Sequence, residues 1–172
     1  MPGQVSSYLH DQLQVGEEID LLPPAGDFYL DVSPDTPVVL LSGGVGLTPM
    51  LSMFNSLAQS GHQAPVHYLH ACENSRQHAF AKQVAALSAA WDNLHSFTWY
   101  QSPLAEDVID RDFNACGLMD LSPLKAALLQ DKTEFYLCGP LAFMQAIHRQ
   151  LKAWGLDDSR LHYELFGPHQ TL

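Results

Sequence analysis

An apolar run that breaks into a cluster of glycines is the feature that most constrains how this chain can fold. Residues 38–50 read VVLLSGGVGLTPM, so a buried-looking segment ends in three glycines and is followed by a helical pattern. A simple change of direction would need only one glycine. Glycine permits positive φ angles and lets a ligand approach the backbone with no Cβ in the way. The pattern therefore predicts a strand, a turn open to a ligand and a helix in succession.

Short apolar runs alternate with amphipathic segments along most of the remaining chain. The expected strands are 37–42, 66–72, 96–101, 134–138 and 161–166, and the expected helices are 48–60, 77–90, 121–130 and 142–154. This alternation is typical of a parallel sheet with helices on both faces. The expected fold class is therefore α/β, with a doubly wound parallel five-stranded sheet.

The first 32 residues do not share this rhythm. A short helix is expected at 6–13 and a strand at 17–22, and the sequence PPAG at 23–26 is a strong breaker. One helix and one strand cannot bury a core by themselves. Residues 1–32 are therefore interpreted as the C-terminal remnant of a preceding domain, and residues 33–172 as the main domain, which opens with the linker SPDTP.

The charge balance limits the partners that this chain can have. The 8 basic and 19 acidic residues give a formal net charge of −11. Nucleic acid is not an expected partner, because phosphate neutralisation needs clustered Lys and Arg. No apolar run reaches the roughly 20 residues of a membrane helix, so no membrane partner is expected either. A phosphate-bearing ligand would have to be held mainly by backbone amides at a helix N-terminus.

The turn GVGLTP at 44–49 fits that requirement. It lies between the first expected strand and the first expected helix, which is where ligands bind in doubly wound sheets. Thr48 is predicted to cap the helix and Pro49 to occupy its first position. The free amides and the helix dipole would then attract a pyrophosphate. A plain glycine-rich turn without a ligand is the alternative.

A second strand-to-helix edge, YLCGP at 136–140, also carries a glycine and a proline at its tip. In a parallel sheet both tips open on the same edge. The two turns together are a more specific indication of dinucleotide binding than either turn alone.

Further motifs carry a resemblance to a known family. They are GQVSSYLH at 3–10, GDF at 26–28, HACEN at 70–74, GLMD at 117–120 and HYELFGPH at 162–169, together with GVGLTPM and YLCGPLAFM. With them the chain resembles the NAD(P)H-binding module of the ferredoxin reductase-like flavoenzymes. It resembles most closely the reductase half of bacterial flavohemoglobins, the nitric oxide dioxygenases. The resemblance extends over essentially all 172 residues.

The resemblance implies a set of cofactor contacts. The cofactor pyrophosphate would be held by Gly44, Val45, Gly46, Leu47, Thr48 and Pro49, and the nicotinamide side would be lined by Cys138, Gly139 and Pro140. FAD would be contacted by Gln4, Val5 and Ser6 at the end of the FAD-binding barrel, and by Leu165, Phe166, Gly167 and Pro168. Phe166 would stack on the flavin ring.

Two residues are expected to take part in the chemistry. Glu164 would influence the flavin potential or the electron path to haem, with a solvated strand-end carboxylate as the alternative. Cys138 would contact the nicotinamide. A nucleophilic thiol and an inert core thiol are the other readings of Cys138.

The implied activity is hydride transfer from NAD(P)H to FAD, with electrons passing on to haem for the conversion of nitric oxide to nitrate. The globin domain, which holds the haem, and most of the FAD barrel with its RxYS motif are absent from this sequence. The chain is therefore expected to be one part of the family pattern, with those domains as its partners. The reductase of a multicomponent oxygenase and a non-catalytic nucleotide-binding fragment are the alternative functions.

Three further expectations concern individual side chains. Arg76 follows the second expected strand and could contact a phosphate or the adenosine ribose, while Glu73 could accept from a 2′-hydroxyl and favour NADH over NADPH. No metal site is expected, because His67 and His70 should point to opposite faces of a strand. The cysteines Cys72, Cys116 and Cys138 form no CxxC pair, which favours reduced thiols and a cytoplasmic location.

Overall fold

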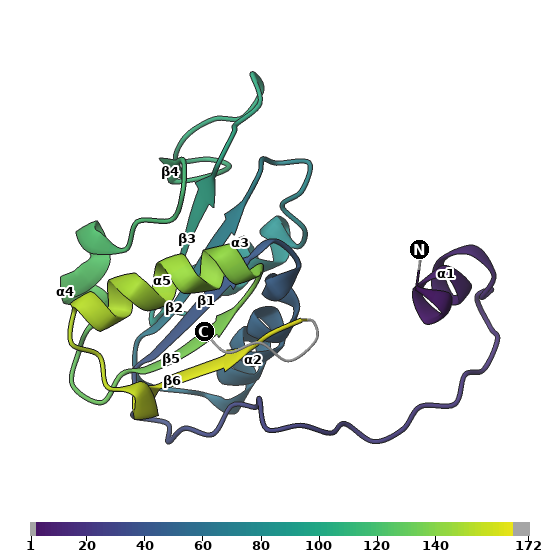
Figure 1. Ribbon diagram of the computed structural model, residues 1–172, viewed down its shortest axis with the longest axis horizontal. Helices are drawn as coiled ribbons and strands as arrows, with labels where there is room; N and C mark the ends of the chain where they lie inside the picture. The colour runs from purple at the N-terminus through teal and green to yellow at the C-terminus, as the bar shows by residue number, and fades with distance from the viewer. Residues whose placement is uncertain (1–2, 167–172) are drawn as a thin grey trace.

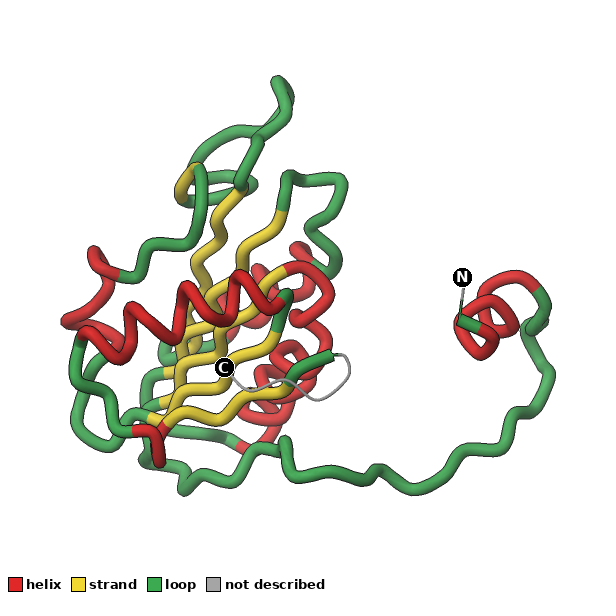
Figure 2. The backbone as a smooth tube through the Cα atoms, viewed as in Figure 1, coloured by secondary structure: helices red, strands yellow, loops and turns green. Residues whose placement is uncertain are grey.

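Six parallel strands form the centre of the molecule (Figures 1 and 2). The computed structural model describes residues 3–166. The strands are β1 (Val38–Gly43), β2 (Val66–Cys72), β3 (Leu94–Tyr100), β4 (Ala115–Cys116), β5 (Glu134–Cys138) and β6 (Leu161–Glu164). Their order in the sheet is β4-β3-β2-β1-β5-β6, so the chain reverses direction next to β1. The predicted doubly wound parallel fold is confirmed.

Helices cover both faces of this sheet. On one face lie α2 (Leu47–Ser60) and α3 (Ala81–Ala90), and on the other lie α4 (Lys125–Leu128) and α5 (Leu141–Ala153). Every residue of β1 is buried, because its successive side chains enter the cores on opposite faces. Full burial of one large aliphatic side chain contributes about 1.5–3 kcal/mol, so this central strand fixes the position of the turn that follows it.

The sheet has six strands where the sequence predicted five. The additional strand, β4, is only two residues long and pairs with the end of β3. So short a segment has no periodicity for a sequence pattern to reveal.

Two helices are shorter than predicted. α3 begins at Ala81 and not at residue 77, because Phe80 has a positive φ of 59° and interrupts the helical path. In place of the helix predicted at 121–130, a 3₁₀ turn, η2 (Ser122–Leu124), leads into the single turn of α4.

The N-terminal part of the chain lies apart from the sheet (Figure 1). Helix α1 (Gln4–Asp11) buries none of its residues. The strand predicted at 17–22 does not form, since no neighbouring strand is there to pair with it. Further along, Phe28, Leu30 and Val32 pack against the α2 side of the core, so contact with the sheet domain begins before residue 33.

Within residues 3–166, every helix is too short or too polar to cross a bilayer.

Candidate functional site

The two glycine-bearing tips pack against each other at the carboxyl edge of the sheet. Ser42 of β1 is in register with Cys138 of β5, so both turns leave the sheet at the same level. A Cβ on Gly46 would overlap the backbone carbonyl of Cys138. The prediction that both tips open on one edge is confirmed, and their close contact requires glycine at this position.

The aromatic ring of Phe143 in α5 lies against both tips. A Cβ on Gly43 or on Gly139 would come within 2.8 Å of this ring. Small residues on the tips thus allow α5 to sit close to the end of the sheet.

The first helix starts differently from the sequence prediction. A 3₁₀ turn, η1 (Gly44–Gly46), runs directly into α2, which begins at Leu47. Thr48 is therefore the second helical residue, and its hydroxyl donates to the Val45 carbonyl at 3.1 Å and caps no amide. Pro49 is the third residue and not the first. It remains within the first turn, where a helix needs no N–H donor.

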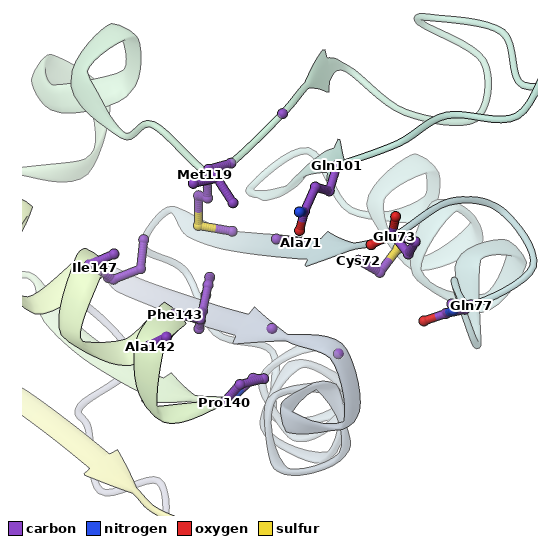
Figure 3. Close-up of a pocket in the computed structure, with 15 residues that line it drawn as sticks. Ala71, Cys72, Glu73, Gln77, Gln101, Met119, Pro140, Ala142, Phe143 and Ile147 are labelled. Atoms are coloured by element: carbon purple, nitrogen blue, oxygen red, sulfur yellow. The ribbon is translucent and has the colours of Figure 1, made fainter.

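A cavity of about 390 Å³ opens beside the two tips, on the α5 side of the sheet (Figure 3). Its volume is within the range of about 300–1,000 Å³ that is typical of small-molecule sites. Its walls come from the ends of β1 and β2, the segments after β3 and β4, and the first turns of α5. The lining residues are Gly43, Gly44, Ala71, Cys72, Glu73, Gln77, Gln101, Gly117, Leu118, Met119, Pro140, Ala142, Phe143, Ala146 and Ile147.

The wall formed by residues 117–119 is held by a side chain of α5. The amide group of Gln150 accepts a hydrogen bond from the Leu121 backbone at 2.8 Å and donates one to the Met119 carbonyl at 3.0 Å. At the other end of this wall the Gly117 amide donates to the Tyr100 carbonyl at 2.9 Å. The cavity therefore has a fixed far side, which suits a preformed ligand site.

The cavity fits a ligand bound by backbone groups and apolar contacts. Among the described residues that line it none is Lys or Arg, and Glu73 is the one carboxylate. The turn that starts η1–α2 borders this cavity through Gly43 and Gly44, and a helix start of this kind can attract a phosphate through its free amides. This arrangement agrees with the expectation drawn from the scarcity of basic residues.

Arg76 lies outside this lining. Its guanidinium pairs with Glu106 at 3.2 Å, and both side chains are largely exposed. Of the two residues predicted at the β2 tip, the structure brings Glu73 to the cavity and places Arg76 on the outer surface.

Cys138 is fully buried beneath the β5 tip. Burial, with a contribution from the nearby Glu164 carboxylate, raises the pKa of its thiol to about 11. At neutral pH the group is therefore an uncharged thiol and a poor nucleophile. Glu164 itself is exposed and is in register with Cys138 on the neighbouring strand.

The residues expected to contact FAD lie in two separate places. Leu165 and Phe166 follow β6 at the tip edge, where half of the Phe166 side chain is exposed (51%). Gln4, Val5 and Ser6 lie in α1, apart from the sheet (Figure 1). The predicted contacts Gly167 and Pro168 lie outside the described residues.

Sequence patterns left several cavity residues unassigned. Gln77, Gln101 and Ile147 belong to no motif, and only the fold brings them to the cavity; Phe143 lies within the motif YLCGPLAFM, but no role in the site is predicted for it. The motif GLMD at 117–120 carries the family resemblance without a predicted role, and the structure places its first three residues in the cavity wall.

The histidines of β2 point to opposite faces, as predicted. His67 packs on His95 with ring centroids 5.0 Å apart, and His70 stacks on His78 at 5.1 Å. Among residues 3–166 no three His, Cys, Asp or Glu side chains converge as metal ligands.

Comparison with solved structures reveals a clear relative and further proteins that share the fold. The FAD/NAD-binding domain of nitric oxide dioxygenase from Vibrio cholerae O1 biovar El Tor is 42% identical, with a TM-score of 0.80 over 97% of this chain and 66% of that one. The flavohemoglobin of Malassezia yamatoensis, with bound FAD and haem, is 24% identical, with a TM-score of 0.72 over 88% of this chain and 39% of that one. The cytochrome b5 reductase domain of Ulva prolifera nitrate reductase shares the fold, with 20% identity and a TM-score of 0.78 over 94% of this chain and 64% of that one.

These comparisons also define the extent of the chain. It spans 66% of the Vibrio domain and 39% of the Malassezia protein. The family model of the oxidoreductase NAD-binding domain matches residues 40–149, which contain both glycine tips and the cavity beside them. The chain therefore belongs to the family of oxidoreductase NAD-binding domains.

Proposed function

We propose that this chain is the NAD(P)H-binding part of a flavohemoglobin-type reductase. When bound, NAD(P)H supplies a hydride and FAD accepts it. The chain itself binds and orients the nicotinamide cofactor and contributes position more than reacting groups.

The observation that carries this proposal is the contact between the two glycine tips beside the cavity. Gly46 abuts the Cys138 carbonyl, and the cavity opens next to Gly43 and Gly44 on one side and Pro140 on the other. A dinucleotide laid across this edge would place its pyrophosphate at the η1–α2 start and its nicotinamide near the β5 tip. Glu73 would then lie on the adenosine side and favour NADH.

The N-terminal segment supports the FAD half of the proposal. Exposed apolar side chains line it, including Val5, Val15, Leu21 and Leu22. Such side chains are expected to pack within the remainder of a flavin-binding barrel, so that residues 1–32 would belong to that domain. Gln4, Val5 and Ser6 would then meet the flavin from one side, and Phe166 from the other.

In the parent protein the reduced flavin would pass electrons to haem, and the reaction would be nitric oxide dioxygenation. The 42% identity to the Vibrio domain supports this assignment. A cytoplasmic location belongs to the same proposal, and it fits three free cysteines that form no disulfide within the described residues.

Calorimetric titration of NADH and NADPH into the 172-residue chain tests the binding step. One-to-one binding is expected, tighter for NADH, and the absence of heat from both cofactors would refute the proposal. Oxidation of NADH by an artificial acceptor in the presence of added FAD then tests the reductase. Binding without turnover would identify a nucleotide-binding module that needs the rest of the barrel.

Nitric oxide consumption tests the parent reaction. The parent protein, purified with its haem and FAD, is expected to remove nitric oxide in the presence of NADH and oxygen and to form nitrate. Nitric oxide consumption that is independent of NADH would exclude this assignment.

A further inference from the structure

A stack of aromatic rings, buried at its His70, Tyr100 and Phe113 members and half-buried at His78, joins β2 and β3 to the segment that follows β2. His70 of β2 is fully buried and stacks on His78 at 5.1 Å. The Nδ1 atom of His78 is hydrogen-bonded to the Tyr100 hydroxyl of β3 at 2.9 Å. The ring of Tyr100 stacks in turn on Phe113 at 4.8 Å. We call His70, His78, Tyr100 and Phe113 the histidine anchor.

The deep end of this anchor is fixed by hydrogen bonds within the sheet. The Ser42 hydroxyl donates to the Leu69 carbonyl at 3.3 Å, and its oxygen lies 2.9 Å from His70 Nδ1. Burial lowers the pKa of His70 to about 3, so its ring is a neutral and fixed surface for His78.

His78 and its neighbour Gln77 lie on different sides of the sheet edge. Gln77 lines the 390 Å³ cavity, whereas His78 borders a separate cavity of about 360 Å³ on the α3 side. The backbone at 77–78 therefore crosses the edge of the sheet. Fixing the His78 ring on one side fixes the position of Gln77 on the other.

The backbone hydrogen bonds at this end of the 73–80 segment are local. The Gln77 amide donates to the Asn74 carbonyl at 3.0 Å and the His78 amide to the Ser75 carbonyl at 3.3 Å, so they shape the turn without tying it to the sheet. The Ser75 amide also donates to the Asp107 carboxylate at 3.3 Å, in the loop after β3.

The backbone bond from the Ser102 amide to the Glu73 carbonyl, at 2.9 Å, secures the start of the segment. The Arg76–Glu106 ion pair is 75% and 62% exposed, and exposed ion pairs contribute little to stability. The segment ends in the positive φ of Phe80, a conformation that persists in a bulky residue only when its surroundings enforce it.

We infer that His78 is a positioning residue for dinucleotide binding. Through Tyr100 and His70 it orders the 73–80 segment, so that Glu73 and Gln77 are preorganised at the cavity before the cofactor arrives. This inference rests on the proposed function, because it assigns the adenosine side of the cofactor to the β2 tip.

Substitutions in the full chain separate positioning from general stability. His78→Phe keeps a ring on His70 but loses the bond to Tyr100, and it is expected to weaken NADH binding by about 3- to 10-fold, the effect of one part-buried hydrogen bond. Tyr100→Phe should weaken binding to the same degree, and the double variant by no more than either single one. His78→Asn, whose amide can reach the position of Nδ1, should recover most of the affinity.

A matched control is provided by His62, whose Nε2 bonds to the Thr36 carbonyl at 2.9 Å near the opposite end of the strands. His62→Phe should lower the melting temperature as much as His78→Phe and leave the Kd for NADH unchanged. If both variants lose the same stability and His78→Phe keeps its affinity for NADH, His78 has a structural role only. Additive losses in the double variant would also overturn the inference.

Amide hydrogen exchange tests the anchor without any cofactor. In His78→Phe the amides of residues 73–80 should exchange faster than in the unmodified chain, while those of β1 and β5 stay protected. Unchanged amide exchange in residues 73–80 would show that His78 does not order the segment, independently of any change in NADH affinity. In a third outcome, the unmodified chain binds no dinucleotide while the amides of residues 73–80 still exchange faster in His78→Phe. That result would refute the proposed function, but it would still show that the histidine anchor orders the segment.

Discussion

The α-carbon of Gly46 faces the backbone carbonyl of Cys138 so closely that no side chain fits between them. The two residues are 92 positions apart in the sequence, and they belong to the two turns that border the cavity. Their contact couples the two halves of the site, because a displacement of one turn must displace the other. The stability of the fold and the shape of the site are therefore linked at this point.

Replacing Gly46 with alanine is expected to cost about 3 kcal/mol or more of unfolding free energy, because backbone cannot yield as a flexible side chain does. NADH affinity should fall as well, since the tips would be forced apart. Thermal unfolding and calorimetry measure the two effects. Gly61→Ala is the control: its φ of 70° is unfavourable for alanine, at a cost of about 1–2 kcal/mol, but no atom lies near the added methyl. A Gly46→Ala variant as stable as the unmodified chain would contradict the tip contact.

The buried thiols should be unreactive. Burial raises the pKa of Cys138 to about 11 and that of Cys72 to about 12, whereas Cys116 is exposed on β4. Brief treatment with iodoacetamide at pH 7.5 is expected to alkylate Cys116 alone, as read by peptide mass spectrometry. Rapid modification of Cys138 in the folded chain would revive its assignment as a nucleophile. Denaturant should make all three cysteines reactive.

Glu73 is expected to reduce the affinity for NADPH. Its carboxylate lines the cavity and would repel a 2′-phosphate. Glu73→Gln should therefore improve the Kd for NADPH about fivefold, which corresponds to about 1 kcal/mol, with little change for NADH. Glu106→Gln is the matched control, since it removes an exposed acid outside the cavity and should alter the NADPH-to-NADH ratio by less than twofold. If the NADPH-to-NADH affinity ratio is unchanged in Glu73→Gln, the adenosine ribose does not bind beside Glu73.

Acid should destabilise the domain below about pH 6.5. Burial lowers the pKa of His70 to about 3, and the pKa values of His62, His67 and His78 are also lowered. As the pH falls from 6.5, the unfolded chain binds protons that the folded chain does not, so the unfolding free energy decreases with falling pH. His70 contributes about 1 kcal/mol per pH unit in this range, and the other three histidines act in the same direction.

Denaturant unfolding of the His70→Asn variant between pH 6.5 and 5 isolates one of these groups. The slope of unfolding free energy against pH should fall by about 1 kcal/mol per pH unit relative to the unmodified chain. Several acidic groups with lowered pKa values, such as Asp107, titrate below this window and do not interfere. An identical slope in the two proteins would mean that His70 is protonated in the folded state.

The parts of this fold that could be read from the sequence are those set by local pattern. The run that became β1 is apolar at nearly every position, and the glycines after it force a turn, so both were predictable. β4 was not, because its two residues are defined by pairing with β3 and not by their own composition. The late start of α3 depends on the positive φ of Phe80, and a phenylalanine in a helical pattern gives no sign of it.

The residues of the candidate site are likewise of two kinds, those that a sequence motif predicts and those that only the fold brings to the cavity. The glycine tips carry a recognisable motif, whereas Gln77 and Gln101 belong to none and reach the cavity only through the path of the folded chain. Arg76 forms its ion pair with Glu106 because the segment after β3 brings Glu106 close to it. No sequence pattern predicts the path of that segment.

The lack of Lys and Arg among the described residues lining the cavity has a kinetic consequence. NADH is a dianion, and the chain carries a formal charge of −11, so the two repel each other at long range. Added salt shortens the reach of this repulsion from about 30 Å at 0.01 M to about 8 Å at 0.15 M. The association rate should consequently rise with ionic strength, in contrast to phosphate sites that attract their ligands with basic side chains.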